Sequence, residues 1–102
     1  MTLRKLKHCE TMAEVREEID VLDRGIVALL ADRLHYIAEA ARIKQSRDQV
    51  RDEARIADVL AKVEAEARRI GANAGVLVQT YRTLIEASIA YEFDRFDRQH
   101  SR

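Results

Sequence analysis

The chain of 102 residues has no proline, no tryptophan, only three glycines and a single cysteine. Proline and glycine punctuate β-rich and multidomain chains, so their scarcity favours a few long helices in one domain spanning residues 1–102. Cys9 has no partner for an internal disulfide, which favours a reducing compartment. Composition therefore predicts an all-α protein.

Long apolar runs and net charge are also absent. The longest apolar run, "IVALLA" at residues 26–31, is far too short to cross a bilayer, and the start "MTLRKLKHCE" has no apolar centre typical of a secretion signal. Eighteen basic residues balance eighteen acidic ones, which disfavours a general polyanion-binding role. We expect a cytoplasmic protein that binds neither membrane nor nucleic acid.

Apolar residues at steps of three and four predict three helices, at about residues 12–46, 54–70 and 74–97. "TMAE" at 11–14 has the form of a capping box for the first, and the charged "RDQVRDE" at 47–53 indicates a loop. Gly71 is placed to end the second helix, and Asn73 to cap the third.

The first predicted helix is too long for its domain. Some 35 residues make a helix of about 50 Å, whereas a compact domain of this size has a radius of gyration of about 13 Å. Its apolar stripe continues for nearly the whole length, so the projecting part needs a partner, and a second copy is the simplest source. We predict an intertwined homodimer.

Arg33 interrupts this apolar stripe, and no acid lies three or four residues from it along the helix. Burial of an unpaired charge costs several kcal/mol, so folding or binding must supply a counter-ion. Lys44 shares the same face roughly 16 Å further on, and the two cations could bracket one small anion. Arg16 is too far away within one chain, but an antiparallel partner could deliver its own Arg16 to the pocket.

Two polar residues, Ser88 and Glu92, lie one turn apart in the inward stripe of the third helix. A glutamate rarely occupies such a position without a reason. Asp52 and Arg55, where the second helix starts, could close the mouth of the same pocket.

Structural interpretations compete with a ligand site. Arg33 paired with Glu92 as a buried ion pair is as plausible on pattern alone. Lys44 with Asp48, and Arg16 with Asp20, have the spacing of ordinary surface pairs along a helix. Ser88 also suits a close helix contact.

The histidines lack the spacing of metal ligands, and neither they nor Cys9 form a recognisable nucleophilic pair. We therefore expect no metal and no covalent catalysis.

These residues, in this order, resemble the all-helical chorismate mutase family, including its isochorismate-pyruvate lyase branch. The resemblance is carried by "EVREEIDVLDRGIVALLADRLHYIAEAARIK", "VRDEAR" at 50–55 and "LIEASIAYE" at 84–92, and extends from residue 13 to about 96. It implies a dimer of three-helix subunits that converts chorismate to prephenate without a cofactor.

The resemblance also implies a role for each polar residue. The partner's copy of Arg16, together with Arg33, would hold the substrate carboxylates, and Lys44 would hydrogen-bond the ether oxygen and a carboxylate. The remaining contacts are implied as follows: Asp52 to the ring hydroxyl, Arg55 and Ser88 to further carboxylate or backbone positions, and Glu92 to the ether oxygen from the opposite side.

One position departs from many bacterial members, which carry glutamine where this chain has Glu92. Only a protonated glutamate can donate a hydrogen bond to the ether oxygen; burial favours that form and a nearby Lys44 opposes it. The chief rival activity is the lyase reaction, which gives salicylate and pyruvate. The segment "HCETMAEVREEID" and the short loop after Lys44 favour the lyase, whereas Asp52 and Arg55 in "VRDEAR" favour the mutase. A non-catalytic helical dimer is a third interpretation.

Overall fold

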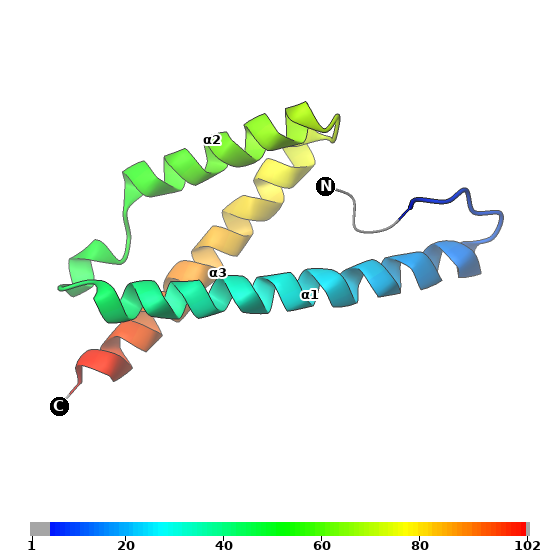
Figure 1. The fold of residues 1–102 in the computed structure, drawn as a ribbon. Helices are drawn as coiled ribbons and strands as arrows, with labels where there is room; N and C mark the ends of the chain where they lie inside the picture. Colours follow the sequence, from blue (N-terminus) through cyan, green and yellow to red (C-terminus); the bar gives the residue numbers. More distant parts are fainter. Residues whose placement is uncertain (1–4, 102) are drawn as a thin grey trace. The chain divides into compact units, whose positions relative to one another are not determined.

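A computed structural model describes residues 5–101, and within that range every regular element is a helix. The elements are α1 (Met12–Ile43), the short 3-10 helix η1 (Arg47–Gln49), α2 (Glu53–Arg69) and α3 (Ala74–His100) (Figure 1). The predicted all-α class with one long N-terminal helix is confirmed. No helix in this part of the chain is both long and apolar enough to span a membrane.

The start of α1 is fixed by the predicted capping box. The Glu14 backbone N–H donates to Thr11 Oγ1 at 3.1 Å, and Glu14 Oε1 accepts from the backbone N–H groups of Thr11 and Glu10 at 3.0 and 2.9 Å. Backbone donors that a helix N-terminus leaves unpaired are thereby satisfied.

The prediction that the first helix reaches residue 46 is wrong, because α1 ends at Ile43. The backbone N–H groups of Gln45 and Ser46 turn instead to the side-chain oxygen of Gln49, at 2.8 and 3.2 Å. Residues 47–49, interpreted as loop, form η1, and Val50 behind them is buried. A glutamine side chain thus replaces the carbonyls that a longer helix would have used.

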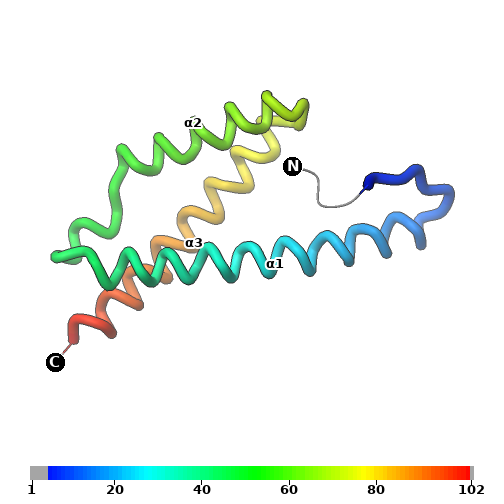
Figure 2. The backbone as a smooth tube through the Cα atoms, viewed as in Figure 1, coloured from blue at the N-terminus to red at the C-terminus, as the bar shows by residue number. Residues whose placement is uncertain are grey.

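A tight turn joins α2 to α3, which contact each other and diverge from the turn in Figures 1 and 2. Gly71 adopts a φ of +74°, the left-handed conformation expected where a helix ends. Asn73 caps α3 by accepting a hydrogen bond from the Val76 N–H at 3.0 Å. Both residues have the roles that the sequence predicts.

The third helix continues to His100, three residues beyond the predicted end at 97. The His100 ring stacks on Phe96 with 3.9 Å between centroids, and its Nδ1 lies 3.0 Å from the Phe96 carbonyl oxygen. This contact lies within the last turn and extends the helix beyond the last apolar residue of its stripe, Phe96.

The chain divides into two units, and the boundary between Arg33 and Leu34 falls inside α1. In the unit that begins at Leu34, Ala41 of α1, Val50 and Phe96 of α3 form a buried cluster, with Ile89 and Phe93 packed against it. The predicted inward stripe of α3 is buried at Ile85, Ser88, Glu92 and Phe96. On α2, Ala67 is buried, but Ile70, expected on the same face, is 55% exposed where the helix ends.

In the N-terminal unit the apolar stripe of α1 is largely uncovered. Its members Met12, Ile19, Leu22, Ile26 and Leu29 are all exposed, from 41% at Leu22 to 59% at Met12. Their spacing of seven, three, four and three residues is that of a helix–helix seam.

We expect the protein to lose stability in acid. The pKa of Glu14 lies below its ordinary value of 4.5 because the N–H groups of Glu10 and Thr11 donate to its carboxylate, and hydrogen bonds from Arg51 lower the pKa of Glu86. The pKa values of Glu39, Asp58 and Glu66 are likewise lowered, chiefly by hydrogen bonds from basic side chains. The folded chain then binds fewer protons than the unfolded chain, so the free energy of unfolding falls as the pH drops below 4.5, the ordinary pKa of a glutamate.

Urea denaturation at a series of pH values measures this loss. A Glu14→Gln variant should show a shallower loss, because one of the depressed carboxyls is gone. Equal slopes for the two proteins would contradict the assignment.

Candidate active site

An ion pair between Lys44 and Glu92 forms the centre of the candidate site. Lys44 Nζ donates to Glu92 Oε2 at 2.6 Å, although the two residues are 48 positions apart in the sequence. The Glu92 side chain is only 6% exposed and that of Lys44 is 28% exposed. A charged hydrogen bond in such an environment is stronger than one at the surface.

The end of α1 positions Lys44. Its backbone N–H still bonds to the Ala40 carbonyl at 3.0 Å, so the residue keeps a helical direction just past the last residue of α1. Its ammonium also lies 3.5 Å from the Val50 carbonyl oxygen. An ammonium has three N–H donors. These two acceptors leave one donor to point elsewhere.

Ser88 is buried one helical turn before Glu92. Its hydroxyl donates to the Leu84 carbonyl within α3 at 2.7 Å. The small side chain and the neighbouring carboxylate thus form a polar strip on the inward face of α3. As predicted, Ser88 and Glu92 lie one turn apart on the same buried face of α3.

A hollow of about 740 Å³ lies beside Lys44 and is open to solvent. It is lined by Ile43, Lys44, Gln45, Asp48, Gln49, Arg51, Asp52 and Glu53. Asp52 therefore shares a surface with Lys44. Two basic and three acidic side chains line the hollow. Because the charges are mixed, the hollow does not by itself form a cationic pocket.

Asp52 and Arg55 have structural contacts of their own. The Asp52 carboxylate caps α2 by accepting a hydrogen bond from the Arg55 N–H at 3.0 Å. The Arg55 guanidinium binds Asp58 at 2.6 Å on the exposed side of α2 and does not line the hollow. Within one chain, Asp52 is brought to the wall beside Lys44 and Arg55 is not.

Arg16 and Arg33 belong to the N-terminal unit, where Arg16 is exposed and Arg33 is partly buried. The structural alternatives for two of the cations are wrong. Lys44 pairs with Glu92 and not with Asp48, because the helix that would align Lys44 with Asp48 ends at Ile43. Within residues 5–101, no ion pair joins Arg16 to Asp20, which accords with the small stability of exposed pairs.

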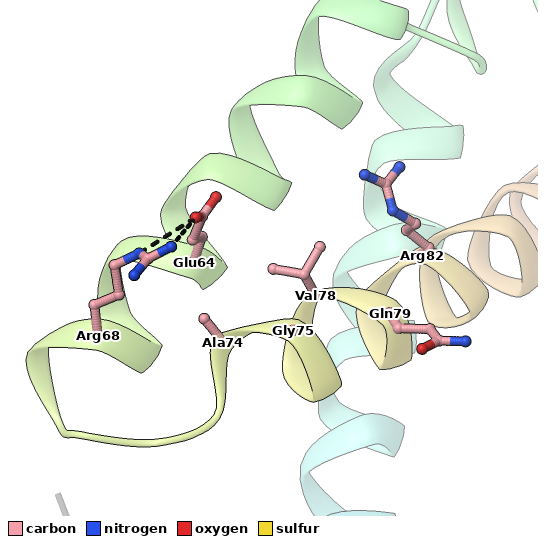
Figure 3. Close-up of a pocket in the computed structure, with 7 residues that line it drawn as sticks. All are labelled: Glu64, Arg68, Ala74, Gly75, Val78, Gln79 and Arg82. Atoms are coloured by element: carbon pink, nitrogen blue, oxygen red, sulfur yellow. Dashed lines mark hydrogen bonds and ion pairs between the residues drawn. The ribbon is translucent and has the colours of Figure 1, made fainter.

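A second hollow, of about 510 Å³, lies where α2 meets α3 and contains none of the predicted residues. Figure 3 shows Arg68 hydrogen-bonded to Glu64 on one side of Val78 and Arg82 on the other. The Arg68 charge is already neutralised, so the chemistry of this hollow does not favour a dianion. Across the residues that the structure describes, no group of three potential ligands could hold a metal ion.

Sequence reasoning missed Arg47 and Arg51, which fasten the connection between α1 and α2 to α3. Arg47 binds Asp97 and lies over Phe93, and Arg51 binds Glu86. The feature of the sequence that could have indicated this attachment is Val50, a single apolar residue in a charged stretch, because such a residue is usually buried in the core. It is 4% exposed.

A comparison with protein families matches residues 15–93 to the model described as chorismate mutase type II. A comparison with curated proteins found no match. Since the family model covers most of the chain, the protein belongs to the chorismate mutase type II family. The resemblance carried by the helix motifs is confirmed, and it supports a function within that family.

Proposed function

We propose that the protein is a chorismate mutase that rearranges chorismate to prephenate. The observation that carries the proposal is the close contact between Lys44 and the buried Glu92, in a chain that belongs to the chorismate mutase type II family. Lys44 is a partly buried cation, and its two acceptors leave one N–H donor that suits the ether oxygen of a dianionic substrate.

The reaction is pericyclic and needs no nucleophile and no cofactor. The enzyme holds the flexible enolpyruvyl arm over the ring and stabilises the negative charge that develops on the breaking C–O bond. Lys44 supplies the cationic donor, and Glu92 and Val50 hold its ammonium in place. Because the geometry exists before substrate arrives, little reorganisation is needed in the transition state.

The remaining cations are proposed to come from two subunits. Arg33 of one chain and Arg16 of the partner would bind the carboxylates, with Asp52 contacting the ring hydroxyl and Ser88 a further carboxylate oxygen. Arg55 would join them only if its guanidinium turned away from Asp58. This arrangement makes the proposed homodimer part of the active site.

The exposed stripe of α1 supports a second copy as the partner. Between residues 12 and 23 the helix carries five acidic and one basic residue, a balance of −4, whereas residues 24–44 carry four basic and two acidic residues, a balance of +2. Antiparallel pairing of two copies would place opposite charges beside each other while covering the apolar seam. Parallel pairing would place like charges together.

The contact between Lys44 and Glu92 leads to a prediction about the Glu92 side chain. Its carboxylate offsets the Lys44 charge and would repel a dianion, whereas an amide at this position could donate a hydrogen bond to the ether oxygen. Glu92→Gln should therefore raise kcat/KM at neutral pH by about tenfold, the effect of ~1.4 kcal/mol. An equal or lower kcat/KM in the folded variant would remove this role.

Incubation with chorismate and isochorismate in separate reactions tests the proposed activity. Formation of prephenate from chorismate is the expected result. Salicylate and pyruvate from isochorismate, without prephenate, would assign the lyase reaction instead. If neither substrate reacts and neither raises the melting temperature, the protein is a non-catalytic helical dimer, because a bound ligand stabilises the folded state by mass action.

A further inference from the structure

The segment from Lys44 to Glu53 joins α1 to α2 and carries two proposed site residues, Lys44 and Asp52, near its ends. We refer to residues 44–53 as the connection. Short surface segments of this kind are usually among the more mobile parts of a protein. Here the connection is attached to α3 at several places along its length.

The first attachment is Arg47. Its Nε donates to Asp97 Oδ1 at 2.9 Å, and its guanidinium lies over the Phe93 ring, 4.4 Å from the centroid. A guanidinium that binds a carboxylate and a ring face together is restrained in both position and orientation.

The second attachment is Arg51. Its Nη1 and Nη2 each donate to a different oxygen of Glu86 at 3.0 Å, and its Nε donates to Glu53 at 2.6 Å. Hydrogen bonds that Arg51 donates to Glu86, and then to Glu53, raise the pKa of Arg51. A guanidinium fork on a single carboxylate is the most directional ion pair that side chains form.

The two attachments lie on either side of the site. Glu86 and Asp97 are eleven residues apart on nearly the same exposed face of α3, roughly 16 Å along its axis. Glu92 lies between them along the axis, on the buried face of the helix. Val50, between the two arginines, is buried against Ala41 and Phe96. The carbonyl oxygen of Val50 is also the second acceptor beside Lys44.

We propose that Arg47 and Arg51 are positioning residues, which hold the connection against α3 so that Lys44 and Asp52 are in place before substrate binds. The inference rests on the proposed function, because the role of Lys44 is part of it. Both guanidinium groups are bound by carboxylates of α3. Each acts through the segment that it fixes.

The proposal predicts a specific kinetic signature. If an attachment is lost, the connection adopts the binding-competent position for only part of the time, and apparent substrate affinity falls by that fraction. Substrate binding pulls the connection back, so KM should rise while kcat is retained. Loss of Lys44 itself should instead lower kcat.

The experiment uses the full chain with Arg51→Glu, Glu86→Arg and the two changes combined. Each single variant should raise KM roughly two- to fivefold, the range typical of exposed ion pairs, and the combined variant should return KM to within about twofold of wild type. The matched control is Arg68→Glu, which breaks an exposed pair with Glu64 inside α2 and should leave KM unchanged.

Amide hydrogen exchange supplies a readout that needs no turnover. The N–H groups of Gln45, Ser46, Gln49 and Val50 are all hydrogen-bonded within the connection. In the single variants they should exchange about threefold to tenfold faster, and in the combined variant at the wild-type rate. Unchanged exchange and KM in the single variants, or no recovery in the combined variant, would overturn the proposal. If wild-type protein turns over neither substrate, the proposed function fails, and exchange alone then decides whether the arginines hold the connection.

Discussion

Lys44→Ala is expected to lower kcat by about 10²- to 10³-fold, the loss typical when one donor to a developing oxyanion is removed. In the structure Lys44 is held by Glu92 and by the Val50 carbonyl, so its donor direction is set before substrate arrives. Steady-state formation of prephenate, followed at saturating chorismate, measures the effect. Lys62→Ala, which removes an exposed lysine paired with Asp58, is the matched control and should leave kcat unchanged.

Lys44→Ala should also lower the stability of the fold, and this loss must be separated from the loss of kcat. Lys44→Ala leaves Glu92 buried without its cation, which costs roughly 3 kcal/mol in the free energy of unfolding. The double variant Lys44→Ala/Glu92→Gln removes that buried charge and should recover most of the melting temperature without recovering kcat. A kcat within threefold of wild type in either variant would contradict the role of Lys44.

The second large effect is expected from the arginines of the N-terminal unit. Arg33→Ala and Arg16→Ala should each lower kcat/KM by about 10²-fold or more, because in the proposed two-chain site each would remove a charged hydrogen bond to a substrate carboxylate. Substrate saturation curves for the two variants give the values. Arg24→Ala, another exposed arginine on α1, is the control and should behave as wild type. Variants of Arg33 and Arg16 with wild-type kcat/KM would exclude them from the site.

The sequence predicted the parts of the fold that depend on local signals. Thr11 and Glu14 form the capping box, Gly71 takes the left-handed turn and Asn73 caps α3, because each signal concerns backbone groups within four residues. The inward position of Ser88 and Glu92 followed from helical periodicity and is present in the structure.

Other features depend on partners distant in the sequence. The pair between Lys44 and Glu92 joins the end of one helix to the middle of another, and helical spacing alone favoured pairing with Asp48 instead. The early end of α1 depends on the side chain of Gln49, which no periodic pattern indicates. The contacts of Arg47 and Arg51 span 50 and 35 positions and need α3 in place before they exist.

The shared active site is the central claim, and subunit complementation tests it most directly. Arg16→Ala and Arg33→Ala chains are unfolded together, refolded as an equal mixture and assayed for turnover of chorismate. If each site takes Arg33 from one chain and Arg16 from the other, half of the dimers are mixed and each has one intact site, so roughly a quarter of wild-type activity should return. A mixture no more active than the separate variants would contradict a site built from two copies of the chain.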